Sequence, residues 1–196
     1  MYYLGHSKIE NITKEDFKPF GEVISTENIE GHKINKGTTT SYNDLINVDI
    51  DTSLIRLLLG KDNFKSRVNI FKAKKRIFPL EIDMLELHEF GSQAFIPLQK
   101  TTFIVLVAPF LIFPISSKTA YTKERVRKPN LNQLKAFMIP PEIGVNLKPQ
   151  IWHYPLVATE DSNFLVIDKK ISKWNLDIYK FNKNNLKITK EEKYNE

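Results

Sequence analysis

The sequence predicts a mainly β protein, folded as a sandwich or small barrel with a few short helices. Short apolar runs recur along the chain with turn residues between them, and few segments show helical periodicity. The run 102–108 (TFIVLVA) is rich in β-branched residues, as in a buried strand. Residues 79–85 (PLEIDML) alternate apolar and acidic side chains, which is typical of a strand with one buried face.

Two short helices are expected. The first lies within 12–20, because Thr13 can cap it and acidic residues follow in its first turn, and Pro19 should end it early. The second spans 131–137, with Asn130 as its cap. The other structured segments are expected to be strands: 42–50, 67–78, 79–85, 94–96, 102–108, 144–147, 151–158 and 164–168.

The chain of 196 residues fits a single domain, since about 150 residues per domain is usual. We expect this domain to span 1–182. A flexible polar tail is expected over 183–196, where Lys, Glu and Asn dominate and few apolar anchors remain.

The charge composition limits the classes of binding partner that are expected. The 29 Lys and Arg residues exceed the 23 Asp and Glu residues, giving a formal charge of +6. The basic stretches 61–76 and 118–128 show only poorly the pattern of basic residues interleaved with aromatics that a nucleic-acid surface needs, so no nucleic-acid partner is expected. Most of these basic residues are expected to lie in solvated loops, and a few of them could bind a small anionic substrate.

The absence of cysteine excludes disulfides, thiolate metal sites and Cys nucleophiles, and fits a reducing compartment, so a cytoplasmic protein is expected. No membrane partner is expected either. The most apolar run, 103–115, is interrupted by Pro109 and Pro114 and is shorter than the roughly 20 residues of a helical span.

Two of the four histidines stand at the ends of predicted strands. Glu86 and His88 share one face of a strand, where a carboxylate and an imidazole can move a proton or share a metal ion. Gln93 follows across a Gly turn and could return to that face. The alternative is a surface pair or a histidine satisfied within the core.

The second histidine, His153, follows Trp152 in a segment bounded by Pro149 and Pro155. Such a step sets a large apolar wall beside an imidazole. The alternative is that Trp152 belongs to the core and His153 lies at its rim.

Together these clusters resemble a degenerate form of the two cupin motifs, and more specifically the chain resembles the ureidoglycolate lyase family of cupin-like proteins. The chain matches the family at 85–98 (LELHEFGSQAFIPL), 144–146 (GVN) and 151–156 (IWHYPL), and the specific parts are GSQAFIPL and the pattern GVN…WH…PL. Further matches occur in the family's order at 12–24 (ITKEDFKPFGEVI), 34–37, 70–73, 134–137 and 164–168.

The resemblance implies a cupin-type double-stranded β-helix, which is a jelly-roll-like small barrel. It further implies a homodimeric cytoplasmic lyase that splits ureidoglycolate into glyoxylate and urea, a late step in allantoin and purine breakdown. The stretch 110–130 is longer than in compact family members and is expected to be a surface insertion.

The resemblance also suggests roles for individual residues. His88 and His153 are the expected acid and base, with Glu86 orienting His88 or raising its basicity. Five residues are expected to bind substrate: Asn35 and Lys72 at the carboxylate, Gln93 and Asn146 at the ureido group, and Trp152 as a wall that excludes water.

Metal dependence stays open at this point. The family is associated with divalent nickel, and the available ligands are His88, His153, Glu86 and Gln93. This set is one imidazole short of the usual cupin cage. A metal-free acid–base mechanism, with no cofactor, is also sufficient.

The chain departs from the family pattern at several positions. The family shows Arg at the position of Leu87 and of Lys72, Arg and His at those of Ser41 and Asn43, and His at that of Tyr154. Because Lys cannot reproduce the bidentate fork of Arg, the substrate is in question. The alternatives are a diverged cupin metalloenzyme and a cupin that binds another small carboxylate.

Overall fold

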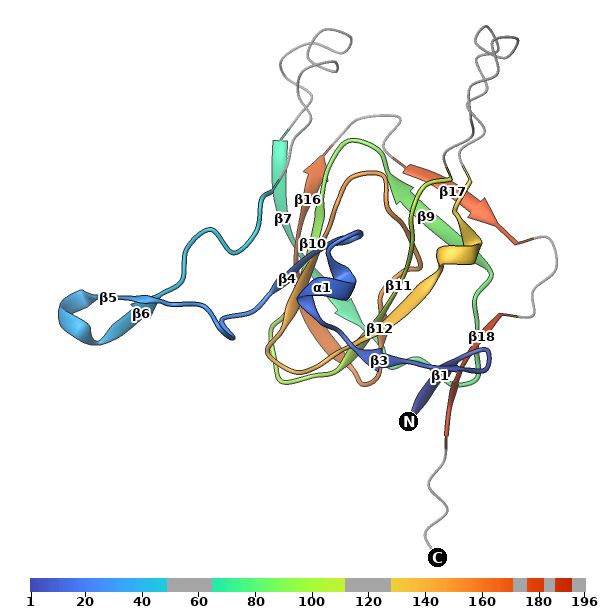
Figure 1. The fold of residues 1–196 in the computed structure, drawn as a ribbon, viewed down its shortest axis with the longest axis horizontal. Helices are drawn as coiled ribbons and strands as arrows, with labels where there is room; N and C mark the ends of the chain where they lie inside the picture. Colours follow the sequence, from blue (N-terminus) through green and yellow to red (C-terminus); the bar gives the residue numbers. More distant parts are fainter. Residues whose placement is uncertain (49–64, 112–127, 171–175, 182–185, 192–196) are drawn as a thin grey trace, which may run out of the picture.

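Two β-sheets face each other and enclose the main core (Figure 1). The structure is a computed structural model that describes residues 1–48, 65–111, 128–170, 176–181 and 186–191. It confirms the prediction of a mainly β protein shaped as a small barrel with short helices. No helix in these described ranges is both long and apolar enough to cross a membrane.

The first sheet has five antiparallel strands. Their order is β4 (Gly21–Ile24), β13 (Gly144–Leu147), β10 (Gln93–Pro97), β16 (Ser162–Lys170) and β7 (Lys65–Ala73). Strand β16 alternates buried and half-buried side chains over most of its length, so the sheet has one face toward the core.

The second sheet faces the first and is centred on the apolar strand β11 (Phe103–Ala108). Its order is β17 (Leu176–Lys180), β9 (Met84–His88), β14 (Trp152–His153), β11, β12 (Lys135–Ile139) and β3 (Glu10–Asn11), and β15 (Val157–Ala158) also pairs with β11. The predicted strands 94–96, 102–108, 144–147 and 164–168 correspond to β10, β11, β13 and β16 and are confirmed.

Both faces of β11 are buried, each in a different apolar cluster. Phe103, Val105 and Val107 belong to the inner cluster, which fills the space between the two sheets. Phe17 of helix α1 (Lys14–Phe17) closes this cluster from one side. Thr13 accepts a hydrogen bond from the backbone N–H of Asp16 at 3.0 Å, so the predicted N-cap is confirmed.

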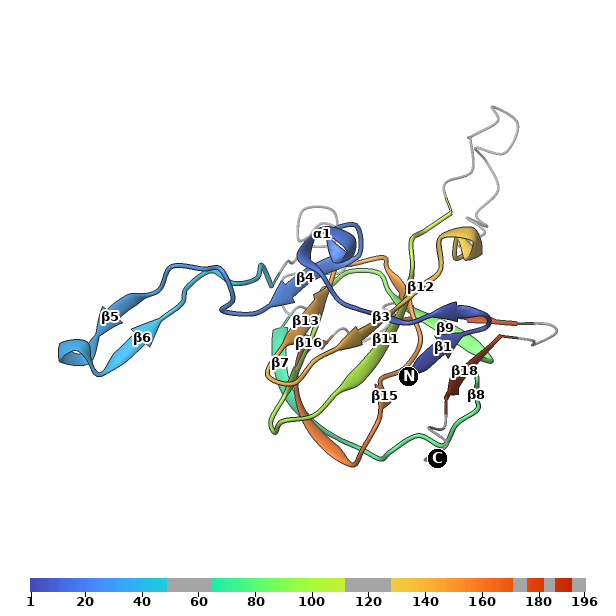
Figure 2. The ribbon, with the colours of Figure 1, turned by 60° about the horizontal axis from the view of Figure 1, so that its bottom comes forward.

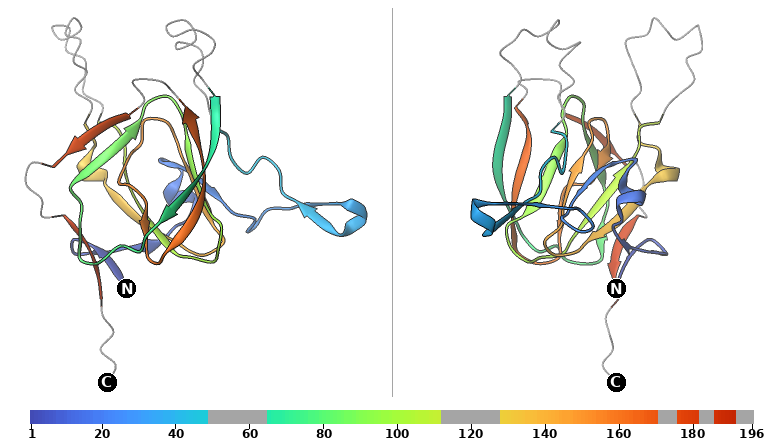
Figure 3. Two further views of the ribbon diagram at one scale, coloured as in Figure 1. Left: turned by 180° about the vertical axis from the view of Figure 1, so that it is seen from behind. Right: turned by 60° about the vertical axis from the view of Figure 1, so that its left-hand side comes forward.

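The other face of β11 contributes Ile104 and Leu106 to an outer cluster. A four-stranded sheet covers it, in the order β2 (Ser7–Lys8), β1 (Tyr2–Leu4), β18 (Lys187–Lys190) and β8 (Leu80–Glu81). Figure 3 shows, from behind, the red strand β18 close to the blue N-terminal segment. The predicted polar tail over 183–196 is therefore wrong for residues 187–190. The N-terminal strand β1 gives β18 a pairing partner, and Ile188 is completely buried in the outer cluster.

Replacing Ile188 with Ala is expected to lower the free energy of unfolding by about 2–4 kcal/mol, because a fully buried aliphatic side chain leaves a cavity. Chemical denaturation measures this change. Thr189→Ala on the neighbouring, half-buried position is the control and should change stability by less than about 1 kcal/mol. Equal effects of the two substitutions would show that β18 does not pack as described.

A hairpin of β5 (His32–Ile34) and β6 (Thr39–Ser41) projects from the barrel, with a short 3₁₀ helix, Asn35–Gly37, at its tip (Figure 2). The predicted strand 42–50 is wrong for residues 42–48, which form none, and 49–50 lie outside the described residues. The predicted strand 67–78 begins earlier and ends at Ala73.

The predicted helix 131–137 is only a 3₁₀ turn, Leu131–Gln133, followed by β12. Pairing of β12 with β11 and β3 overrides the local capping signal, and Asn130 makes no side-chain cap. Segment 110–130, the expected insertion, falls mostly on residues 112–127, outside the described ranges. Its ends meet where Phe110 bridges to Pro129.

Candidate active site

Strands β9 and β14 bring Glu86, His88 and His153 together on the inner side of the second sheet. Their register pairs Glu86 with His153 and Leu87 with Trp152. Because side chains alternate along a strand, the two pairs point to opposite faces. Leu87 and Trp152 lie in the outer cluster, so Glu86, His88 and His153 face the interior of the barrel.

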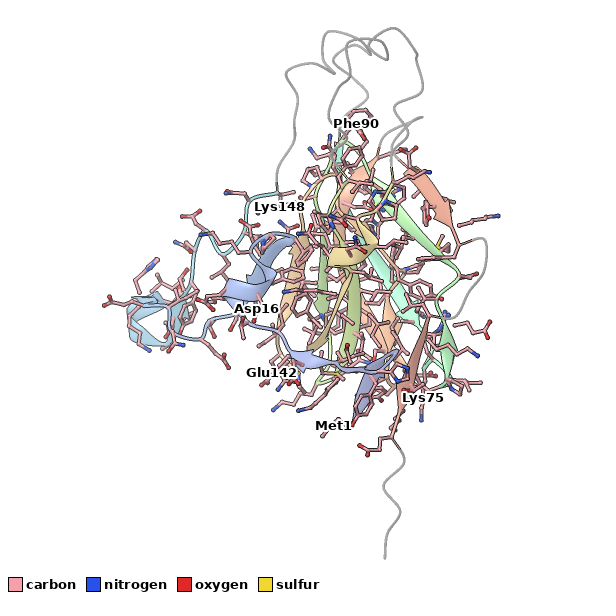
Figure 4. All side chains as sticks on the ribbon, turned by 45° about the vertical axis from the view of Figure 1, so that its right-hand side comes forward. Met1, Asp16, Lys75, Phe90, Glu142 and Lys148 are labelled. Atoms are coloured by element: carbon pink, nitrogen blue, oxygen red, sulfur yellow. The ribbon has the colours of Figure 1, made fainter. Side chains whose placement is uncertain are left out.

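The two sequence clusters are also tied together through the backbone. The N–H of Gln150 donates to the carbonyl of His88 at 2.8 Å, and the side chain of Gln150 donates to Glu89 at 3.2 Å. These bonds link the end of β9 to the segment that enters β14. Figure 4 labels Phe90, two residues beyond His88, at one end of the barrel, and Met1 and Lys75 at the other.

The hydrogen bonding of His153 fixes its tautomer. Its Nδ1 lies 3.0 Å from the carbonyl oxygen of Ile151. A carbonyl can only accept, so Nδ1 carries a proton and Nε2 is the nitrogen that exchanges one. Nε2 lies 3.4 Å from Oε1 of Glu86, and the His153 side chain is only 4% exposed.

The carboxyl of Glu86 is held in its ionised form. Burial raises its pKa, but the contact with His153 and the charge of His88 outweigh burial, and the pKa lies below its ordinary value. The His88 and His153 ring centroids are 5.4 Å apart. A carboxylate facing Nε2 stabilises either a proton on that nitrogen or a metal cation between the two groups.

The same three residues can hold a metal ion. One ligand atom from each of Glu86, His88 and His153 lies within 4.8 Å of the other two. The bond from Nδ1 of His153 to a backbone carbonyl is the arrangement that orients a metal-ligating histidine. The residues therefore fit a divalent ion, with imidazole and carboxylate as its ligands.

Gln93 reaches the same end of the barrel from the facing sheet. It shares the inner face of β10 with Phe95 of the inner cluster and pairs with Leu147. The residue is 5% exposed, and its Oε1 has no hydrogen-bond partner within the described part of the chain. A buried acceptor of this kind is suited to an N–H group of a ligand.

Two expected substrate-binding residues face elsewhere. Trp152 packs in the outer cluster against Tyr179, so it does not form a wall beside His153. Asn146 alternates with Val145 and Leu147 and therefore points away from the inner cluster. Its amide donates to Glu22 at 2.8 Å and to the carbonyl of Asn47 at 2.9 Å.

The two expected carboxylate-binding residues also lie away from the site. Asn35 stands on the hairpin that projects from the barrel on the side away from strand β9, which ends at His88 (Figure 2). Lys72 is exposed and alternates with Phe71 and Ala73, so it faces outward near the far end of β7.

Most departures from the family pattern also fall outside the site. Leu87 and Tyr154 belong to the outer cluster. Ser41 and Asn43 bond to each other on the hairpin at 2.7 Å.

Three residues that the sequence interpretation missed face the interior from the first sheet. Asp168 accepts hydrogen bonds from Arg67, through Nε at 2.5 Å and Nη2 at 3.0 Å, and from Asn69 at 3.0 Å. Alternation along the predicted strand 67–78 is a signal that could have placed Arg67 and Asn69 on one face. The pairing of β7 with β16, which joins them to Asp168, is not visible in the sequence.

Comparison with known proteins places the chain among proteins of one family. The family model described as "Ureidoglycolate lyase" matches residues 6–189. Proteins named ureidoglycolate lyase are similar over most of their length: one from Brucella anthropi is 38% identical over 181 residues, covering 92% of each chain. One from Pseudomonas paraeruginosa is 38% identical over 175 residues, covering 89% of each. One from Burkholderia mallei is 34% identical over 162 residues, covering 82% of this chain and 81% of the relative.

Proposed function

The chain belongs to the ureidoglycolate lyase family, and we propose that it cleaves the carbon–nitrogen bond of ureidoglycolate to give glyoxylate and urea. The observation that carries this proposal is the Glu86–His153 pair with His88 beside it, set on the inner face of the barrel. This reaction needs a base for the hydroxyl proton, an acid for the departing nitrogen and a binding group for the carboxylate.

His153 is the base in this scheme. Its Nε2 takes the hydroxyl proton while the carbonyl of glyoxylate forms and the carbon–nitrogen bond breaks. The resulting imidazolium is stabilised on both nitrogens, by the carbonyl of Ile151 and by the carboxylate of Glu86. Glu86 therefore serves His153 first, rather than His88 as the sequence suggested.

His88 is the acid, and protonates the urea nitrogen as it leaves. Gln93 accepts a hydrogen bond from the ureido group through its unpaired Oε1. A divalent ion such as nickel, held by Glu86, His88 and His153, would instead supply Lewis-acid polarisation of a substrate oxygen.

We further propose that the protein is a cytoplasmic homodimer, on the family resemblance and the absence of cysteine. Light scattering checks the assembly.

The purified protein is expected to release glyoxylate from racemic ureidoglycolate well above the spontaneous breakdown of the substrate. The assay is run with and without a chelator. Turnover that survives the chelator supports the acid–base roles of the two histidines. Turnover that is lost to the chelator and restored by a divalent ion makes them ligands, as in the alternative of a cupin metalloenzyme. No turnover under either condition contradicts the proposed substrate.

A further inference from the structure

Arg67 lies on the inner face of β7, opposite the sheet that carries the histidines. Its partner in the register is Asp168 of β16, and the next inward pairs along the strands join Asn69 with Val166 and Phe71 with Phe164. Val166 and Phe164 belong to the inner cluster. Alternation therefore turns Arg67, Asn69 and Asp168 toward the barrel interior.

These residues stand at the same end of the barrel as the proposed catalytic residues. The turn after His88 leads directly into Gln93, the first residue of β10. The register that pairs Ala94 with Ile167 sets Gln93 opposite Asp168, which in turn pairs with Arg67. One row across the first sheet thus holds Gln93, Asp168 and Arg67, and Figure 1 shows this end of β7 and β16 at the same side as the turn from β9 to β10.

The guanidinium of Arg67 is fixed in orientation and open to a ligand. Its fork to Asp168 uses Nε and Nη2, so Nη1 takes no part. The oxygens of Asp168 are occupied by Arg67 and Asn69, and this side chain is 9% exposed, against 48% for Arg67. An anion that approaches this end therefore meets the free edge of the guanidinium before it meets the Asp168 carboxylate.

We propose that Arg67 binds the carboxylate of the substrate, which is the role that the sequence suggested for Lys72. The inference rests on the proposed function. Arg presents a planar fork of donors that matches a carboxylate, and here Asp168 holds that fork in place. With the carboxylate at Arg67 and the ureido group at Gln93, the hydroxyl-bearing carbon lies toward the histidines of the facing sheet.

Steady-state kinetics of Arg67→Leu and Lys72→Leu test this assignment. Arg67→Leu is expected to raise KM for ureidoglycolate about 10- to 100-fold, the scale of a lost hydrogen-bonded charge partner. Competitive inhibition by glyoxylate should weaken by a similar factor, whereas inhibition by urea, which has no carboxylate, should stay unchanged. Lys72→Leu removes a cation from the outward face of the same strand. It should leave KM and the inhibition constants of glyoxylate and urea as in the wild type.

A further variant controls for misfolding, because Arg67→Leu leaves the buried Asp168 carboxylate with Asn69 but without its positively charged partner. Arg67→Leu combined with Asp168→Asn removes that charge and should show the same rise in KM. An unchanged KM and glyoxylate inhibition in either folded variant overturns the assignment while the proposed function stands. If Lys72→Leu instead shows the rise in KM and the weaker inhibition by glyoxylate, the carboxylate-binding role belongs to Lys72 and the assignment to Arg67 is overturned. A wild-type protein without turnover overturns the proposed function and this inference with it.

Discussion

Replacing His153 with Gln is expected to lower kcat at least about a hundredfold, the scale of a lost general base. Gln keeps a donor that can reach the carbonyl of Ile151 but has no nitrogen that accepts a proton at the position of Nε2. His88→Gln is expected to lower kcat by a similar factor through loss of the acid. The measurement is the initial rate of glyoxylate release at saturating substrate.

His6→Gln is the matched control, since His6 is exposed and lies outside the barrel interior, and its kcat should equal that of the wild type. His153 is buried, so thermal melting must first show that the variant folds. A folded His153→Gln variant with near-normal kcat would remove His153 from the reaction.

The Glu86→Gln substitution is expected to lower kcat about a hundredfold, because the imidazolium of His153 loses the negative charge that stabilises it in the transition state. KM should change much less, since Glu86 acts on the proton that moves rather than on the bound substrate. A rise in KM of about a hundredfold with a normal kcat would instead assign Glu86 to substrate binding.

Glu86 also makes stability depend on pH in a defined direction. Its pKa is lower in the folded protein than its ordinary value, so ionised Glu86 stabilises the fold above that ordinary value. As pH falls, the carboxylate takes up a proton first in the unfolded state, and the stabilisation is lost. The wild type should therefore exceed Glu86→Gln in unfolding free energy near pH 7, and the difference should shrink below about pH 4. A difference that grows with acid would contradict the lowered pKa.

The fold could be predicted from the sequence where local pattern and tertiary pairing agree. The β-branched run of β11 is buried on both faces, and Thr13 caps its helix as expected. The prediction fails where distant pairing decides. The polar segment around Ile188 becomes a strand because the N-terminal strand β1 lies beside it, and residues 135–137 become β12 because β11 and β3 pair with them.

The candidate site shows the same division. Period two placed Glu86 and His88 on one face, and the structure confirms that they face the same interior. Adjacent side chains on a strand point to opposite faces, so the sequence could have shown that Trp152 and His153 do not share a face. The meeting of Glu86 with His153, and of Arg67 with Asp168, depends on strand register between distant segments, which no single sequence displays.

Identification of the nitrogen product tests the central claim most directly. Ureidoglycolate labelled with ¹⁵N in the ureido group is followed by NMR, with the spontaneous reaction subtracted. We expect the enzyme-dependent reaction to give urea in equal amount to glyoxylate, with both labelled nitrogens retained in urea. Labelled ammonia in its place, or no product above the spontaneous rate, would contradict a carbon–nitrogen lyase built on His153, Glu86 and His88.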